Sequence, residues 1–221
     1  MWDAALGVTL NGTDVSALAS QVPGAVDLLQ ATAANQPLYT GAPTYNGQPS
    51  VQFVLANADS LLAANIDLIG TGAHTYMSAH RVRAIAAGVY NGIMGNARAG
   101  AGSSLNAETT TGLRNLLFVG NSDHAMGSTP TTVPEMWSIG SGGSGSGIVT
   151  GMVNGVAQSM SSQLGSWAAP GATGSVFLGA SPATGGSDMD WLFGALFTTL
   201  LPNAVAIRIH KAGCARLGLL A

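Results

Sequence analysis

The strongest pattern along the chain is a pair of alternating segments on either side of the dipeptide Asn154-Gly155. A two-residue type I′ turn needs positive φ at both central positions, and Asn-Gly adopts this conformation at the least steric cost. The sequence therefore predicts an antiparallel β-hairpin over residues 148–160. Its register follows as Val153 opposite Val156, Gly151 opposite Gln158 and Val149 opposite Met160.

Apolar and polar residues alternate in several other segments, as the side chains of a strand do. Along 74–84, for example, Tyr76 and Arg81 fall on opposite faces. The segment 85–94 is expected to return beside this strand. The full set of expected strands is 50–55, 58–63, 74–84, 85–94, 113–120, 135–139, 175–179 and 190–200.

The segment 190–200 is apolar on both faces, which is typical of a strand that is covered on two sides. We expect Trp191, Phe193 and Phe197 to share one of these faces. Pro202 suits the first turn of a helix. Basic residues then follow toward a C-terminal end, where the helix dipole favours them. The sequence therefore predicts a helix over 203–217.

Stretches rich in Gly, Ala, Ser and Asn separate these segments, and we expect 95–111 and 121–132 to be surface loops. Residues 140–147 resemble a flexible linker by composition. Strands are expected on both sides of them, so we place them inside a single domain that spans 1–221. About ten strands and one terminal helix predict an all-β fold, a two-sheet antiparallel β-sandwich with the C-terminal helix on its outside.

Charged residues make up only 8% of the 221 residues, where about 25% is usual. A surface built mainly from Gly, Ala, Ser and Thr has few charges to keep a free monomer in solution. This favours an oligomer, in which neighbouring subunits cover much of that surface. The alternative is a monomer with a neutral surface. The net charge is −3 with 7 Lys+Arg, so no footprint for nucleic acid or anionic lipid is present. The sequence contains no run of about 18 apolar residues, so we expect no membrane-spanning helix.

The single Cys214 cannot form an internal disulfide, and we interpret it as a small buried apolar residue on the helix. The start of the chain, Met-Trp-Asp-Ala-Ala, lacks a basic region followed by an apolar one, so no secretion signal is expected. Synthesis in a reducing cytoplasm fits both observations.

Several segments share a pattern with a known class of domain. They are Gln30–Tyr39 with Asn46–Phe53, the hairpin Met152–Val156, and Val176–Ala180 followed by Trp191–Phe197. Together, and with the terminal helix, they resemble the concanavalin A-like lectin/glucanase domains of the LamG type over about 6–217. The resemblance implies a two-sheet jelly roll. Such domains occur as lectins, glycosidases, adhesion modules and bacteriophage virion proteins, so fold alone does not select a function.

Glycoside hydrolysis needs two carboxyl groups that face each other across roughly 5–9.5 Å. The resemblance implies that catalytic members place two or three carboxylates at alternate positions of one strand. This chain has two Glu residues, Glu108 and Glu135, and they lie in unrelated segments. We therefore expect that the chain is not an enzyme and has no catalytic residues.

Asp188 and Asp190 form the one close carboxylate pair, and their side chains share a face if the segment is extended. They fit either a polar turn that leads into the Trp191 strand or a site for Ca²⁺ or sugar hydroxyls, since hard cations bind several oxygen atoms. Trp167 lies in an expected loop and is the best candidate for an exposed ring on which a sugar stacks. No other metal site and no cofactor are expected.

The leading interpretation is a structural or accessory protein of a bacteriophage virion, either a capsid decoration or a tail or fibre component. The virion context comes from the resemblance. The expected partners are other virion proteins and further copies of the chain, with a trimer favoured; nucleic acid and membrane are not expected. The protein would be synthesised in the host cytoplasm and located in the virion. The alternative is a glycan-binding module of a secreted or surface protein.

Overall fold

The computed structural model describes residues 1–84, 90–98, 100–108, 114–118, 122–126, 131–146, 149–160, 168–180, 186 and 188–219, which form seventeen strands, three short 3₁₀ turns and one α-helix. The strands are β1 (Trp2–Asp3), β2 (Val8–Asn11), β3 (Asp14–Leu18), β4 (Leu28–Leu29), β5 (Leu38–Tyr45), β6 (Gln48–Phe53), β7 (Ser60–Ala64), β8 (His74–Ala84), β9 (Tyr90–Arg98), β10 (Ala101–Glu108), β11 (Arg114–Phe118), β12 (Ser122–Met126), β13 (Glu135–Ser141), β14 (Val149–Val153), β15 (Val156–Gln158), β16 (Ser175–Gly179) and β17 (Asp188–Phe197). The 3₁₀ turns are η1 (Ala33–Asn35), η2 (Leu55–Asn57) and η3 (Gly171–Thr173), and the helix is α1 (Asn203–Leu217).

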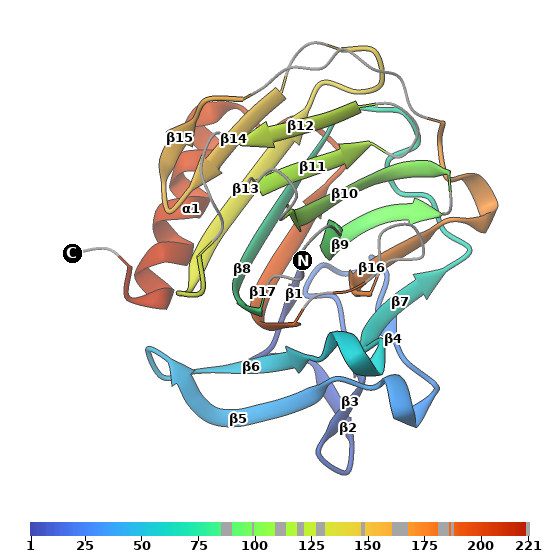
Figure 1. Cartoon of the computed structure of the whole chain (residues 1–221), viewed down its shortest axis with the longest axis vertical. Coiled ribbons are helices and arrows are strands. Elements are labelled where there is room, and N and C mark those ends of the chain that lie inside the picture. The colour runs from blue at the N-terminus through green and yellow to red at the C-terminus, as the bar shows by residue number, and fades with distance from the viewer. Residues whose placement is uncertain are drawn as a thin grey trace.

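Every strand pairing among the described residues is antiparallel, and the strands fold into two facing layers (Figure 1). The first sheet runs β5–β6–β17–β8–β13–β14–β15, and β1 pairs with β17 beyond the end of β6. The second sheet runs β2–β3–β4–β7–β16–β9–β10–β11–β12. The predicted β-sandwich with a C-terminal helix is therefore confirmed.

The main hydrophobic core lies between the two sheets. Trp137 and Trp191 are completely buried there, together with Phe53 and Tyr76. The alternation along β8 explains this arrangement, because Tyr76 faces the core while its neighbour Met77 packs on the opposite face of the sheet. Burying one large apolar side chain contributes about 1.5–3 kcal/mol, so these residues supply a large share of the driving force for folding.

Helix α1 covers the outer face of the first sheet, beside β13 and β14 (Figure 1). Its buried residues Cys214 and Leu217 pack against Met136 in a second apolar cluster, as the prediction for Cys214 requires. Near the end of the helix, both terminal nitrogens of Arg216 contact the carboxylate of Asp3 on β1, at 2.5 and 2.8 Å. In the part of the chain that the structure describes, no helix has the length and apolar character that a membrane span needs.

A connected set of buried polar groups joins the two sheets. The Tyr76 hydroxyl on β8 donates to the carbonyl oxygen of Ser103 on β10 at 3.0 Å and accepts the amide of Asn96 on β9 at 3.1 Å. The Ser103 hydroxyl lies 3.0 Å from Nε2 of His74. Burial lowers the pKa of His74, which keeps the imidazole neutral inside the sandwich. These contacts satisfy polar groups that would otherwise be costly to bury.

The predicted hairpin is present, with φ of 49° at Asn154 and 80° at Gly155. The observed pairs include Val153–Val156 and Gly151–Gln158. The predicted pairing of Val149 with Met160 is wrong, because β15 ends at Gln158. Met160 instead forms a bridge with Met126 of the second sheet and packs against the main core.

The two expected loops contain strands, and both predictions are wrong. Residues 95–111 include the end of β9 and all of β10, and 121–132 include β12. Small residues are needed here because the structure leaves no room for larger ones: a Cβ on Gly95 would lie 2.6 Å from the Phe177 ring and from Ser104. Strands β1 to β5, in residues 2–45, were not expected either, so the expected number of about ten strands is too low.

Two further expectations about neighbouring strands are also wrong. Of the expected strand 85–94 the structure describes residues 90–94, which belong to β9 and pair with β10 and β16 instead of β8; residues 85–89 lie outside the described residues. On β17 the register shifts between Trp191 and Phe193. Such an irregularity turns the following side chains to the other face, so Trp191 lies in the main core whereas Phe193 packs with the cluster under α1.

Candidate functional site

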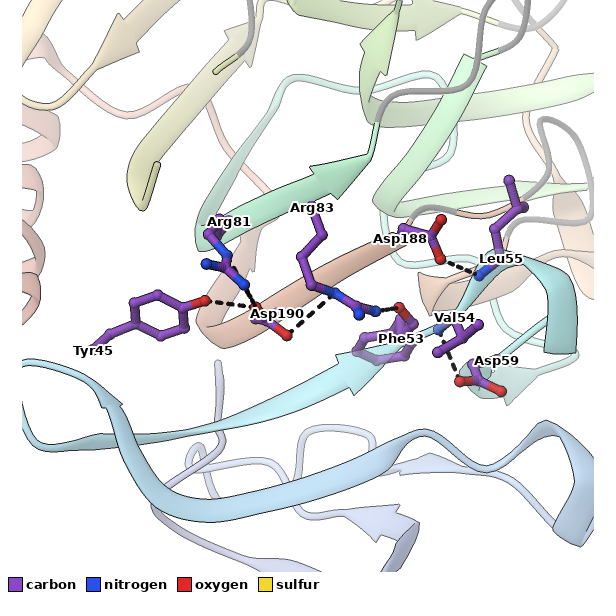
Figure 2. Close-up of polar contacts among 9 residues, drawn as sticks. All are labelled: Tyr45, Phe53, Val54, Leu55, Asp59, Arg81, Arg83, Asp188 and Asp190. Atoms are coloured by element: carbon purple, nitrogen blue, oxygen red, sulfur yellow. Dashed lines mark hydrogen bonds and ion pairs between the residues drawn. The ribbon is translucent and has the colours of Figure 1, made fainter. Parts of the chain in front are cut away.

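Asp190 of β17 is only 5% exposed and lies at the centre of a polar cluster with residues from β8 and β5 (Figure 2). Its Oδ2 accepts a hydrogen bond from Nε of Arg81 at 3.1 Å and pairs with Nη2 of the same residue at 2.8 Å. Its Oδ1 lies 3.4 Å from Nε of Arg83. The hydroxyl of Tyr45 donates to Oδ2 at 2.5 Å. Both carboxylate oxygens are therefore occupied.

The electrostatics of this cluster follow from one buried anion between two cations. Burial and the hydrogen bond to Asp190 raise the pKa of Tyr45, so the phenol remains a donor. The Arg81 guanidinium also stacks 5.4 Å from the centre of the Tyr45 ring, a geometry typical of a cation–π contact. Such an arrangement ties the end of β5 to β17 and β8 within the first sheet and makes Asp190 an ion-pair anchor.

Asp188 has a different partner, although it lies only two residues away. Its Oδ1 accepts the amide of Leu55 at 2.9 Å, and Oδ2 of Asp59 accepts the preceding amide of Val54 at 2.8 Å (Figure 2). Arg83 adds a hydrogen bond to the carbonyl oxygen of Phe53 at 2.6 Å. Burial raises the pKa of Asp59. These side chains fix the backbone where β6 passes into η2.

The predicted pair Asp188 and Asp190 is thus close in space, but each residue has protein partners of its own. Sequence reasoning missed Arg81 and Arg83 as the partners of Asp190. The available signal was two arginines at alternate positions of one strand in a chain with 7 Lys+Arg. Among the described residues, no group of three or more His, Cys, Asp or Glu is placed to hold a metal ion.

The predicted stacking residue Trp167 lies outside the described residues. Trp137 and Trp191 are both completely buried, and the indole nitrogen of Trp137 donates to Oε2 of Glu135 at 2.9 Å. Neither of these two rings can therefore receive a sugar.

A second candidate site is a groove of about 210 Å³ between α1 and the β14–β15 hairpin, called here the α1–hairpin groove. Residues of β8, β13, β14 and β15 line it on one side, and Leu201 and the first turns of α1 line it on the other. None of these described residues is charged. They are Thr75, Ser138, Val149, Thr150, Gly151, Met152, Ala157, Gln158, Leu201, Asn203, Ala206 and Ile207. Hydroxyl and amide groups alternate with apolar ones, which suits a small neutral ligand with both polar and apolar surfaces.

Comparison with solved structures shows what this fold is similar to. An arabinofuranosidase complexed with arabinofuranosyl-α-1,2-xylobiose matches 92% of this chain and 51% of its own, with a TM-score of 0.64 and 15% identity. A Trypanosoma rangeli sialidase matches 96% of this chain and 32% of its own, with a TM-score of 0.54 and 12% identity. The binding domain of Paraclostridial Mosquitocidal Protein 1 matches 84% and 51%, with a TM-score of 0.57 and 10% identity.

At these identities the similarity shows the fold alone, and the chain spans about half or less of the length of these structures. No protein-family model and no curated protein match the sequence. The comparisons therefore establish a β-sandwich without establishing a family.

These comparisons overturn the expectation that the chain is not an enzyme. The arabinofuranosidase and the sialidase are enzymes, and each shares its fold with more than nine-tenths of this chain. The expectation required carboxylates at alternate positions of one strand. Hydrolysis requires only that two carboxyl groups face each other at the right separation, and residues from different strands can meet that requirement.

Proposed function

We propose that this chain is a carbohydrate-recognition domain of the concanavalin A-like, LamG type. The observation that supports it most is the shared fold: an arabinofuranosidase and a sialidase match nearly the whole chain, and such a sialidase has been solved with bound sialic acid. The segments that resemble LamG-type domains support the same proposal.

The chemistry of the surface supports recognition of glycans over recognition of charged polymers. Only 8% of the residues are charged, so most of the chain's hydrogen-bonding groups are backbone, hydroxyl and amide groups. Sugar hydroxyls both donate and accept hydrogen bonds, and these groups match them.

The proposal is tested by applying the purified protein to an array of neutral and acidic glycans, followed by calorimetric titration of each positive glycan. We expect saturable binding to at least one glycan, with competition by the same free sugar. Absence of binding across the whole array would contradict the proposal. A parallel assay with 4-nitrophenyl α-L-arabinofuranoside and a 4-nitrophenyl sialoside measures whether hydrolysis accompanies recognition.

A position in a bacteriophage virion stays a prediction and is compatible with glycan recognition. Mass spectrometry of purified particles tests it, since a virion component is retained through density-gradient purification while a free protein is lost.

A further inference from the structure

We infer that the α1–hairpin groove binds a single neutral sugar residue. The inference rests on the proposed function and assigns it a location and a ligand class. It depends on the shape of the groove, on the hydroxyl groups at its floor and on the absence of charge among its described lining residues.

The floor of the groove carries two hydroxyl groups, from Thr75 on β8 and Thr150 on β14. Gly140 on β13 lies between these strands and is closely packed, since a Cβ there would lie 2.6 Å from Cδ1 of Leu200, 2.8 Å from Oγ1 of Thr150 and 3.2 Å from Oγ1 of Thr75. Two hydroxyl groups from the neighbouring strands β14 and β8 therefore converge above Gly140.

One of these hydroxyls has a fixed orientation. Oγ1 of Thr75 donates to the carbonyl oxygen of Thr199 at 3.0 Å and accepts the amide of Leu201 at 3.0 Å. These bonds hold the segment before α1 against the sheet and set the position of the groove's rim. The ligand site is thus built on a rigid part of the fold, which lowers the entropic cost of binding.

The walls combine polar and apolar groups in the way a sugar ring requires. Gln158 and Asn203 present amides from opposite sides, from β15 and from the first turn of α1. Ile207, which is 36% exposed, and Met152 present apolar surface. A sugar ring has hydroxyls at its edge and C–H groups on its faces, so it can satisfy both kinds of wall.

The size and charge of the groove define the ligand class. Sites for drug-sized ligands occupy about 300–1,000 Å³, so a groove of about 210 Å³ fits one sugar residue. An acidic sugar would normally be matched by Arg or Lys, and neither is among the lining residues. The hollow beside β4 and β7 is larger but is lined mostly by Leu, Ala, Val and Ile, so it offers few groups for hydroxyls.

The test uses a blocking variant and a matched control on the same short strand. Ala157 lines the groove, so Ala157→Trp fills it; its neighbour Val156 is 63% exposed and does not line it, so Val156→Trp adds the same ring elsewhere. Both are accommodated by a strand, because aromatic residues favour β structure. Methyl glycosides of L-arabinofuranose, D-galactose and D-xylose are titrated by NMR, with N-acetylneuraminic acid as the acidic comparison.

We expect at least one neutral glycoside to bind, with affinity lowered at least tenfold by Ala157→Trp and changed less than twofold by Val156→Trp. Thr150→Val, which keeps the shape and removes the hydroxyl, should weaken binding by about three- to tenfold. Glycan binding that is equal in wild type and Ala157→Trp would overturn the inference and leave the proposed function standing. Preferred binding of N-acetylneuraminic acid would also overturn it. Failure of the wild type to bind any glycan would overturn both.

Discussion

Asp190 and Asp188 lie two residues apart on β17, and the difference between their partners has energetic consequences. Asp190 is buried between Arg81 and Arg83, whose side chains are 36% and 24% exposed. Asp188 accepts one backbone hydrogen bond from Leu55. Removing the charge of a buried carboxylate leaves its cations uncompensated, whereas an amide can replace a carboxylate as a simple hydrogen-bond acceptor.

We therefore expect Asp190→Asn to destabilise the protein by about 2 kcal/mol, less than the 3–5 kcal/mol of a fully buried pair because both arginines contact solvent. Asp188→Asn is the matched control and should cost less than about 1 kcal/mol. Urea unfolding at pH 7 measures both values. Equal losses for the two variants would show that the ion pairs add nothing to stability.

At the scale of elements, the contact between α1 and the β14–β15 hairpin includes a hydrogen bond to one buried histidine. His210 is completely buried on α1, and its Nδ1 accepts the amide of Gly155 at 3.2 Å. Burial lowers its pKa from 6.5 to about 4. The hairpin residues 149–158 carry no charged side chain, so nothing on them would stabilise an imidazolium at this position.

The sign of the pH effect follows from the lowered pKa of His210. The unfolded chain binds the proton more readily, so stability is complete above about pH 6.5 and falls as the pH decreases to about 4. The loss attributable to His210 is about 3 kcal/mol. His210→Gln should be less stable at pH 7, by about 1 kcal/mol, and should lose less stability in acid.

Urea unfolding of both proteins between pH 4 and 7 tests this prediction. His74, whose pKa is also lowered by burial, contributes equally to wild type and variant, so the difference between their curves isolates His210. Curves that stay parallel over this range would exclude His210 as the titrating group.

At the scale of the whole molecule, low charge favours association between copies of the chain. Charged residues make up 8% of the sequence, which leaves little repulsion between subunits. The segments expected as surface loops, 95–111 and 121–132, contain the end of β9, all of β10 and β12, so they do not support a particular interface. Exposed apolar residues remain elsewhere, among them Leu6, Leu29 and Val133.

We expect an oligomer in solution, with a trimer favoured, and a mass of about three times the 22.0 kDa of one chain. Light scattering coupled to size exclusion at micromolar concentration measures it. A mass of 22.0 kDa that does not change with protein concentration would contradict the prediction.

The sequence by itself determined the features that depend on a few adjacent residues. The type I′ turn at Asn154-Gly155 follows from the local φ preferences of two residues. The two faces of β8 follow from a side-chain period of two, and the start of α1 follows from Pro202. In the same way, the closeness of Asp188 and Asp190 was visible because they are two residues apart.

Only the tertiary structure decided which strands pair, which small residues are buried and which side chains meet. Gly95 and Ser104 are residue types common in loops, yet they pair with each other across β9 and β10. A small residue is needed at position 95 because the Phe177 ring and the Ser103 carbonyl oxygen lie close to it. Asp190 is an anchor because Arg81 lies 109 residues away in the chain and opposite it in the sheet. The α1–hairpin groove likewise combines residues from Thr75 to Ile207. Such contacts depend on burial summed over the whole chain, which no local pattern contains.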